Sequence, residues 1–304
     1  MSVIQVEHLT KDYGHNRGVF DVNVAVNQGE CYGFLGPNGA GKTTTIRHLL
    51  GFSKPGKGQT SIAGLDSWTN SPEIKSMVGY LPGEIELPTG LTGTQFLDMM
   101  AKMRRTNNVK HLASLLERFE LDPNVDTKRM SLGVRRKLAV VTAFMHDPQI
   151  LILDEPTSGL DPIMQQIFID FILEEKKRGK TIFLSSHIFR EVDATCDRIA
   201  IIKNGEIVSE FFPEKLREES DRIFRVSLHN EKSFAALIAQ PFQFSSVNPE
   251  KLRARVRIKT EEINKLIDAI ADLNVAEFQE FPFTLEDYFM QFYREDKIFE
   301  GVKQ

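Results

Sequence analysis

Cysteine is scarce in this sequence, and long apolar runs are absent. The 304 residues include two cysteines, Cys31 and Cys196, which match no CxxC or Cys/His ligand spacing. This argues against a structural zinc site or a disulfide framework and indicates a reduced, cytoplasmic protein. The longest apolar runs, such as 138–141 and 150–153, are far below the ~20 residues that cross a bilayer, and the N-terminus lacks the features of a signal peptide. A membrane would therefore be reached through a partner.

A strong excess of charge is lacking as well. The formal net charge is -4, with 26% charged and 41% hydrophobic residues, as in an ordinary folded protein that can bury a sizeable core. Such a balance gives no electrostatic reason to expect a nucleic-acid partner. The basic stretches Lys128-Arg129 and Arg135-Arg136-Lys137 are interpreted as a solvated face. We expect no nucleic-acid partner.

The apolar pattern changes twice along the chain. Short strands and turns come first, helical spacing follows at about 84–145, and apolar strands alternating with a helix then return. Such alternation predicts an α/β fold with a mixed, largely parallel sheet, over residues 1–214. Residues 215–304 show the order strand, helix, strand, strand, helix, strand, which predicts a small ferredoxin-like α+β domain with a terminal helix.

A glycine-rich segment, G-P-N-G-A-G-K-T, matches the GxxxxGK[ST] pattern in full, after a predicted strand and before a predicted helix. Glycines let backbone N–H groups converge on phosphates, and the helix N-terminus adds the positive end of its dipole. Lys42 would reach the β- and γ-phosphates, and the Thr43 hydroxyl would ligate Mg²⁺. The residues expected to bind ATP in this segment are Gly36, Pro37, Asn38, Gly39, Ala40, Gly41, Lys42, Thr43 and Thr44.

Two adjacent carboxylates, Asp154 and Glu155, end the apolar run 150–153. Adjacent carboxylates repel each other unless a cation is near. Asp154 suits the shell of Mg²⁺, and Glu155 can act as the general base toward an attacking water. At the end of the next predicted strand, His187 offers an imidazole near the γ-phosphate. Glu155 and His187 are the expected catalytic residues of an ATPase.

Together these motifs resemble the nucleotide-binding subunit of ABC transporters, over about residues 1–210. GPNGAGKTT resembles the Walker A loop, LILDEPTSGLD the Walker B strand and the D-loop with Asp161, and Ser186-His187 the switch histidine. Tyr13 resembles the aromatic residue that stacks on adenine in this family. The resemblance implies the P-loop fold of an ABC cassette, with ATP and Mg²⁺ as cofactors.

The segment MSLGVRRKL resembles the family signature, usually LSGGQ, with Leu132 and Val134 as departures. In the family this segment closes over the γ-phosphate that the other subunit holds. The resemblance therefore implies a homodimer or heterodimer of ATPase subunits in which Ser131 and Gly133 contact ATP across the interface. Ser131 keeps a hydroxyl donor, and Gly133 keeps a backbone N–H that a ligand can approach closely.

The segment GYLPGE stands where the family carries a glutamine that offers an oxygen to Mg²⁺, and Gly83 has no such side chain. Pro82-Gly83 suits a type II turn, with proline and glycine at its two central positions. Glu84 or a water molecule could supply the oxygen instead. Thr43 and Asp154 would then dominate the metal site.

The C-terminal part resembles the domain appended to ATPase subunits of ABC-2-type exporters, which include drug and antibiotic exporters. This implies a subunit bound to an integral-membrane permease at the inner face of the membrane, powering export of a drug, antibiotic, peptide or lipid-like substrate. The apolar residues that could line a groove for a permease helix are Phe96, Met99, Met100 and Met103. Two alternatives stay open: a soluble ABC ATPase acting on the ribosome or DNA, and a subunit whose C-terminal domain senses a small ligand.

Overall fold

The computed structural model describes residues 2–15, 17–219, 221–281 and 284–294. The chain divides into two compact units, Met1–Phe211 and Phe212–Gln304. The boundary expected between residues 214 and 215 falls inside the helix α8 (Pro213–Glu219). Proline is favoured in the first turn of a helix, and Pro213 begins α8.

The centre of the first unit is a six-stranded sheet with the order β10-β9-β3-β8-β7-β6. Its strands are β3 (Cys31–Leu35), β6 (Val78–Leu81), β7 (Ile150–Asp154), β8 (Thr181–Ser186), β9 (Arg198–Lys203) and β10 (Glu206–Phe211). All neighbouring pairs are parallel except β9 with β10. Strands β3, β7 and β8 are buried along their whole length, as parallel strands covered on both faces are. The predicted α/β class and largely parallel sheet are confirmed.

A second sheet, antiparallel, lies in the same unit with the order β2-β1-β4-β5. Its strands are β1 (Ser2–Asp12), β2 (Gly18–Asn27), β4 (Lys57–Ile62) and β5 (Leu65–Asp66). Alternate residues of β2, such as Val22, Val24 and Val26, are buried in a core shared with β3 and α1. The period-two pattern predicts such strands, but the sequence did not separate them from the parallel sheet because pairing is non-local.

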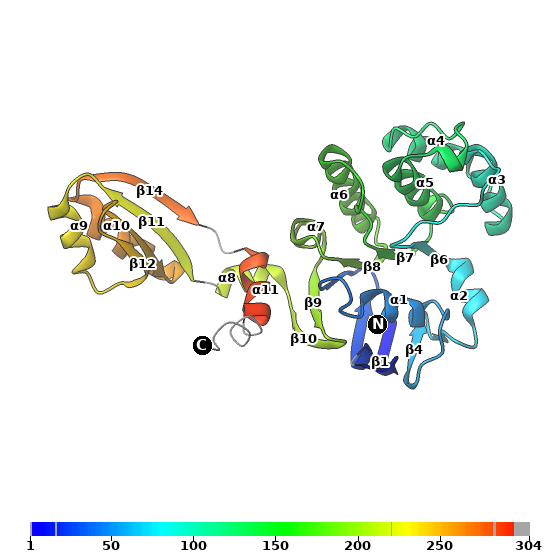
Figure 1. The fold of residues 1–304 in the computed structure, drawn as a ribbon, viewed down its shortest axis with the longest axis horizontal. Helices are drawn as coiled ribbons and strands as arrows, with labels where there is room; N and C mark the ends of the chain where they lie inside the picture. Colours follow the sequence, from blue (N-terminus) through cyan, green and yellow to red (C-terminus); the bar gives the residue numbers. More distant parts are fainter. Residues whose placement is uncertain (1, 16, 220, 282–283, 295–304) are drawn as a thin grey trace, which may run out of the picture. The chain divides into compact units, whose positions relative to one another are not determined.

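Three helices of the first unit lie together as a group. The helices of this unit are α1 (Lys42–Leu49), α2 (Ser71–Met77), α3 (Gly93–Arg104), α4 (Val109–Arg118), α5 (Leu132–Phe144), α6 (Pro162–Lys177) and α7 (Phe189–Thr195), with a short 3-10 helix η1 (Thr127–Arg129). Figure 1 shows α3, α4 and α5, called the helical group below, gathered beside β6 and β7. Phe96 is buried within this group, so the expectation that it lines a groove is wrong, whereas Met103 is 70% exposed. The largest apolar side chain of α3 packs inward.

The second unit is built on an antiparallel sheet with the order β12-β13-β11-β14. Its elements are α8, β11 (Arg222–Leu228), α9 (Glu231–Ile238), β12 (Gln243–Asn248), β13 (Arg253–Ile258), the 3-10 helix η2 (Thr260–Glu262), α10 (Ile263–Ala271), β14 (Val275–Phe281) and α11 (Leu285–Arg294). Helices α9 and α10 pack on one face of the sheet, where Ala254, Val256 and Ile258 are buried. We interpret this order as ferredoxin-like. Residues 295–304 of the expected domain lie outside the described residues.

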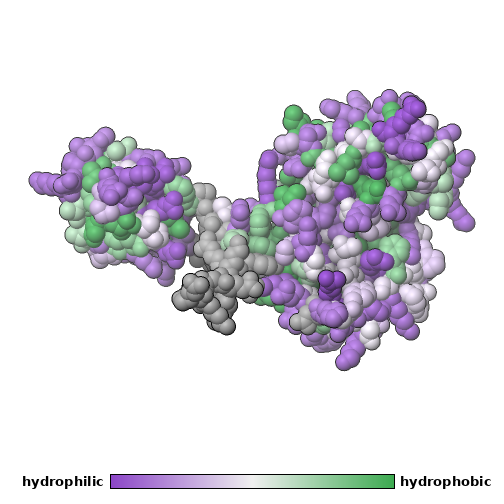
Figure 2. Space-filling view, in the orientation of Figure 1, coloured by the Kyte–Doolittle hydropathy of each residue, from purple (hydrophilic) through white to green (hydrophobic). Residues whose placement is uncertain are grey.

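The surface visible in Figure 2 is mostly hydrophilic, with small separate hydrophobic patches. Within the described residues, no helix combines the length and the apolar character that crossing a membrane requires.

Candidate functional site

The site lies at the carboxyl ends of β3, β7 and β8, which are neighbours in the sheet. Leu35 pairs with Ser186, and Asp154 pairs with Ser185, so the segments that follow these strands begin side by side. Ligands of open α/β sheets bind outside this edge. The phosphate loop, the carboxylate pair and His187 are therefore brought together by the parallel register.

The phosphate loop leads directly into α1, which begins at Lys42. Gly41 has a φ of +113°, and a Cβ there would lie 2.9 Å from a methyl group of Val19, so only glycine fits. The Lys42 ammonium donates to the carbonyl oxygens of Gly36, at 2.7 Å, and Pro37, at 3.2 Å. Its third contact is an ion pair with Glu155 Oε1 at 2.9 Å.

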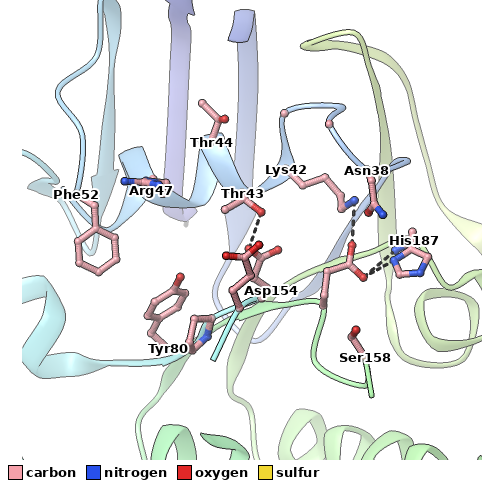
Figure 3. Close-up of a pocket in the computed structure, with 16 residues that line it drawn as sticks. Asn38, Lys42, Thr43, Thr44, Arg47, Phe52, Tyr80, Asp154, Ser158 and His187 are labelled. Atoms are coloured by element: carbon pink, nitrogen blue, oxygen red, sulfur yellow. Dashed lines mark hydrogen bonds and ion pairs between the residues drawn. The ribbon is translucent and has the colours of Figure 1, made fainter. Parts of the chain in front are cut away.

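Glu155 joins the lysine to the histidine. His187 Nδ1 lies 2.6 Å from Glu155 Oε2, and Figure 3 shows the side chains of Lys42 and His187 approaching this carboxylate from the phosphate loop and from the end of β8. Glu155 has a φ of +50°, a left-handed backbone conformation that costs a non-glycine residue free energy. Its backbone N–H donates to Ser185 O at 2.9 Å, which helps to hold that conformation.

Asp154 is fully buried beside Thr43. The Thr43 hydroxyl donates to Asp154 Oδ2 at 2.8 Å, and the Ser185 hydroxyl donates to Oδ1. Burial raises the pKa of Asp154, and these two hydrogen bonds offset the rise only in part. A buried carboxylate beside a hydroxyl oxygen is a donor set that suits Mg²⁺. Within the described residues no three His, Cys, Asp or Glu side chains form a metal cluster.

The Pro82-Gly83 segment follows β6 and lies against Asp154. A Cβ at position 83 would lie 3.1 Å from Asp154 Oδ2, so glycine lets the backbone approach. Gly83 does not have a positive φ, and the expected type II turn is therefore wrong. The guanidinium of Arg136 donates to the carbonyl oxygens of both Pro82 and Gly83, and these hydrogen bonds help to orient the two peptide groups.

A cavity of about 1000 Å³ joins these parts and includes residues that the sequence did not indicate. The newly found lining residues are Arg47, Phe52, Tyr80 and Ser158. Burial, together with the charge of Asp154, raises the pKa of Tyr80 to about 12. Ser158 and Tyr80 lie within the quoted segments LILDEPTSGLD and GYLPGE, whose spacing assigned no role to them, and Arg47 and Phe52 lie outside any quoted motif.

The interpretation of the basic stretch as a solvated face is wrong for Arg136. It is only 3% exposed. The signal that could have shown this is helical spacing, since Arg136 shares one face of α5 with the buried residues Val140, Ala143 and Phe144.

The remaining expected site residues do not line this cavity. Tyr13 is 55% exposed in the turn after β1. Ser131 is the N-cap of α5 and accepts a hydrogen bond from Val134 N–H, and Gly133 lies in the first turn of that helix. Asp161 is the N-cap of α6, where its carboxylate accepts from the N–H groups of Ile163 and Met164.

Comparison with known proteins agrees with this arrangement. A profile of the family described as ABC transporter matches residues 19–158. The bacitracin transport ATP-binding protein of Bacillus licheniformis is 33% identical over 307 residues, which is 95% of this chain and 97% of that protein. The Nod factor export ATP-binding protein I of Rhizobium meliloti is 30% identical, over 95% of this chain and 87% of its own length.

Solved structures show the same fold. One described as the ATP-binding subunit of an ABC transporter has a TM-score of 0.66 and 29% identity, covering 72% of this chain and 93% of that one. A dimeric bacterial ABC transporter cassette has a TM-score of 0.63 at 22% identity, covering 69% and 98%. Full-length similarity, the cassette fold and the convergence of Lys42, Asp154 and Glu155 agree. The chain belongs to the ABC transporter family, as an ATP-binding subunit whose hydrolysis of ATP powers transport.

Proposed function

We propose that this subunit powers an exporter of a drug, antibiotic, peptide or lipid-like substrate. The observation that carries the ATPase part is Glu155, held between Lys42 and His187 at the carboxyl end of the parallel sheet. The exporter part is supported by the relatives named for bacitracin transport and Nod factor export, which match nearly the whole chain, including the C-terminal unit.

In the proposed reaction, the phosphate loop binds ATP and Glu155 acts as general base. The loop N–H groups and Lys42 hold the phosphates, so that Lys42 exchanges part of its contact with Glu155 for the γ-phosphate. Glu155 then takes a proton from a water whose oxygen attacks the γ-phosphorus. The bond to the β–γ bridging oxygen breaks, leaving ADP and phosphate. His187, bonded to Glu155, orients that carboxylate and the γ-phosphate.

Thr43 and Asp154 are the proposed ligands of Mg²⁺, with Glu84 as a further oxygen donor from the rim of the cavity. When bound, Mg²⁺ screens the negative charge of the phosphates. Ser185 keeps Asp154 oriented, because its hydroxyl donates to the second carboxylate oxygen. Thr43 is in the first turn of α1, so the proposed ligand set also fixes the helix that carries Lys42.

Dimerisation completes the proposed site. Ser131 and Gly133 lie at the N-terminal end of α5, where the helix dipole favours an anion, and neither lines the cavity of its own chain. We assign them to the ATP held by a second ATPase subunit, identical or related. Tyr13 would stack on adenine from the turn after β1, and Asp161 belongs to the D-loop at the same interface.

The proposed membrane partner is a permease, which would keep this subunit at the inner, cytoplasmic face of the membrane. The helical group offers Met99 and Met100, which are partly buried, and Met103, which is exposed, as apolar contacts for a permease helix. Methionine adapts to such surfaces because its side chain is flexible and polarisable.

Two measurements test this proposal. Lys42→Ala should weaken ATP binding at least about thirtyfold in a direct titration, because a partly buried charge contact with the phosphates is lost. Lys177→Ala, on the exposed side of α6, is the control and should bind as the wild type does. Unchanged affinity in Lys42→Ala would contradict the phosphate site.

Purification from membranes tests the exporter part separately. The wild-type chain should co-purify with a polytopic membrane protein. Co-purification with ribosomes or DNA instead, or ATPase inhibition by a small ligand that maps to residues 221–281, would favour the alternatives over an exporter.

A further inference from the structure

Arg136 is the buried member of an otherwise accessible basic run on α5. It is 3% exposed, whereas Arg135 and Lys137 are only partly buried. Burial lowers the pKa of Arg136, and the charges of Asp154, Glu155 and Glu191 oppose that effect. A charge is costly to bury without compensation, so the contacts of this guanidinium need an explanation.

The guanidinium is satisfied by three backbone carbonyl oxygens. Its Nη1 donates to Pro82 O at 2.9 Å, its Nη2 to Gly83 O at 2.6 Å, and its Nε to Ser158 O at 2.9 Å. Among the described residues no carboxylate forms an ion pair with it. The planar fork of arginine can serve several acceptors at once, which the single ammonium of lysine cannot do in the same geometry.

Each of the two segments that Arg136 holds contacts one residue of the carboxylate pair, Gly83 the side chain of Asp154 and Ser158 the backbone of Glu155. Gly83 lies against Asp154, as the 3.1 Å distance from its virtual Cβ to Oδ2 shows. Ser158 donates its backbone N–H to the backbone carbonyl oxygen of Glu155 at 3.1 Å and lines the cavity. Because Gly83 has no side chain, it meets both Arg136 and Asp154 through its backbone.

At its other end, Arg136 belongs to the helix that Ser131 caps. The two residues lie within the first two turns of α5, so the same short stretch of helix carries both of them. We propose that Arg136 is a positioning residue that fixes the N-terminal end of α5 relative to the Pro82-Gly83 and Ser158 backbones. It thereby couples this chain's own phosphate site to the surface offered to the second subunit's ATP. This inference rests on the proposed function.

The chain offers a matched control in Arg104 of α3. Arg104 also joins the helical group to the sheet through backbone carbonyl oxygens, those of Lys75 and Val78, and burial lowers its pKa too. It makes no contact with the carboxylate pair. A general loosening of the helical group should therefore appear in Arg104→Met as well as in Arg136→Met.

The test uses the full chain and compares three quantities: ATP affinity of the isolated subunit, kcat, and ATP-driven dimerisation in a Glu155→Gln background. Arg136→Met should bind ATP within about threefold of wild type but lose at least about tenfold in kcat and in dimerisation, the loss expected for hydrogen bonds from a charged donor. Arg136→Lys should fall between, and Arg104→Met should change each quantity by less than about threefold.

Equal losses in Arg136→Met and Arg104→Met would overturn the inference, and so would a loss of ATP affinity as large as the loss of dimerisation. If Arg136→Met does not fold, Arg136→Lys decides: dimerisation equal to wild type would overturn the inference, and reduced dimerisation with retained ATP affinity would support it. A wild-type chain that neither binds ATP nor dimerises would instead contradict the proposed function.

Discussion

The central sheet has a buried lysine among carboxylates at each of its two ends, and the two clusters differ in how their charges are balanced. At the amino end, Lys180 is 1% exposed and lies 2.5 Å from Asp147, with Glu175 as its second partner. Arg178 pairs with the same two carboxylates at 2.7 Å each. Two cations thus meet two anions, and every member has a partner within the protein.

At the carboxyl end the balance is different. Lys42 and His187 share one carboxylate, that of Glu155. Asp154 has hydroxyl groups as partners and no cation within ion-pair distance among the described residues. Asp154 is therefore a carboxylate without an ion-pair partner where the parallel strands end.

The pKa values of the two aspartates express this difference. Burial alone would raise the pKa of Asp147, but the hydrogen bonds from Lys180 and Arg178 outweigh it and hold that pKa below its usual value. Burial raises the pKa of Asp154, and its neighbours do not reverse the rise. A cluster in which every charge has a partner contributes to stability. A buried carboxylate without a cationic partner instead favours the binding of a ligand together with its cation. The charges at the amino end of the sheet therefore stabilise the fold, whereas those at the carboxyl end serve the nucleotide site.

Glu155→Gln tests the functional end and should have the largest effect. Loss of the general base should lower the rate of ATP hydrolysis by about 10²- to 10⁴-fold. Lys42, Thr43 and the phosphate loop remain, so ATP binding should persist and the ATP-bound dimer should accumulate. Phosphate release and size-exclusion chromatography with ATP measure the two effects. Hydrolysis at the wild-type rate would show that Glu155 is not the base.

Lys180→Met tests the structural end. Removing one partner of a buried ion-pair cluster leaves uncompensated carboxylates, so the free energy of unfolding should fall by about 3–5 kcal/mol. The ATPase rate per folded molecule should stay near that of wild type. Denaturant unfolding gives the stability, and Lys177→Met on the exposed side of α6 is the control. If Lys180→Met stopped hydrolysis without loss of stability, the contrast between the two ends would be wrong.

The sequence predicts the functional end better than the structural end. The spacing from Gly36 to Thr43, and the carboxylates after an apolar strand, carry their chemistry within short segments, and parallel strands bring such segments together. Asp147 and Lys180 lie far apart in the chain, and only the pairing of β7 with β8 makes them neighbours. Helical spacing could have shown that Arg136 is buried, but not what it contacts, because its three acceptors belong to two distant loops.

Glu191 gives a prediction about pH. It is buried beneath the segment that carries His187, where the Ser186 hydroxyl donates to its carboxyl group at 2.7 Å, and burial raises its pKa to about 8 from the ordinary 4.5. The folded state then binds a proton that the unfolded state releases, so stability should fall as pH rises from about 5 to about 8 and level off above.

The difference in unfolding free energy between wild type and Glu191→Gln isolates this effect, because other titrating groups cancel. It should change by up to about 1.4 kcal/mol per pH unit within that window, in the direction of a less stable wild type at higher pH. Parallel stability curves for the two proteins would show that Glu191 titrates normally. A slope would show that the carboxyl end of the sheet also contains an acid with no sufficient cationic partner.

Substitution of Glu84, at the rim of the cavity, should have the smallest effect of these changes. It tests whether the carboxylates that serve the metal extend to this rim. Its side chain is exposed, and interactions between exposed charges contribute only about 0.2–1 kcal/mol. If Glu84 helps to hold Mg²⁺, Glu84→Ala should raise the Mg²⁺ concentration needed for half-maximal ATPase activity by about two- to fivefold, with little change at saturating Mg²⁺. Glu86→Ala, two residues further along the same segment, is the control for a change in net charge. An identical Mg²⁺ dependence in both variants would confine the metal site to Thr43 and Asp154, with water in place of the missing side chain at Gly83.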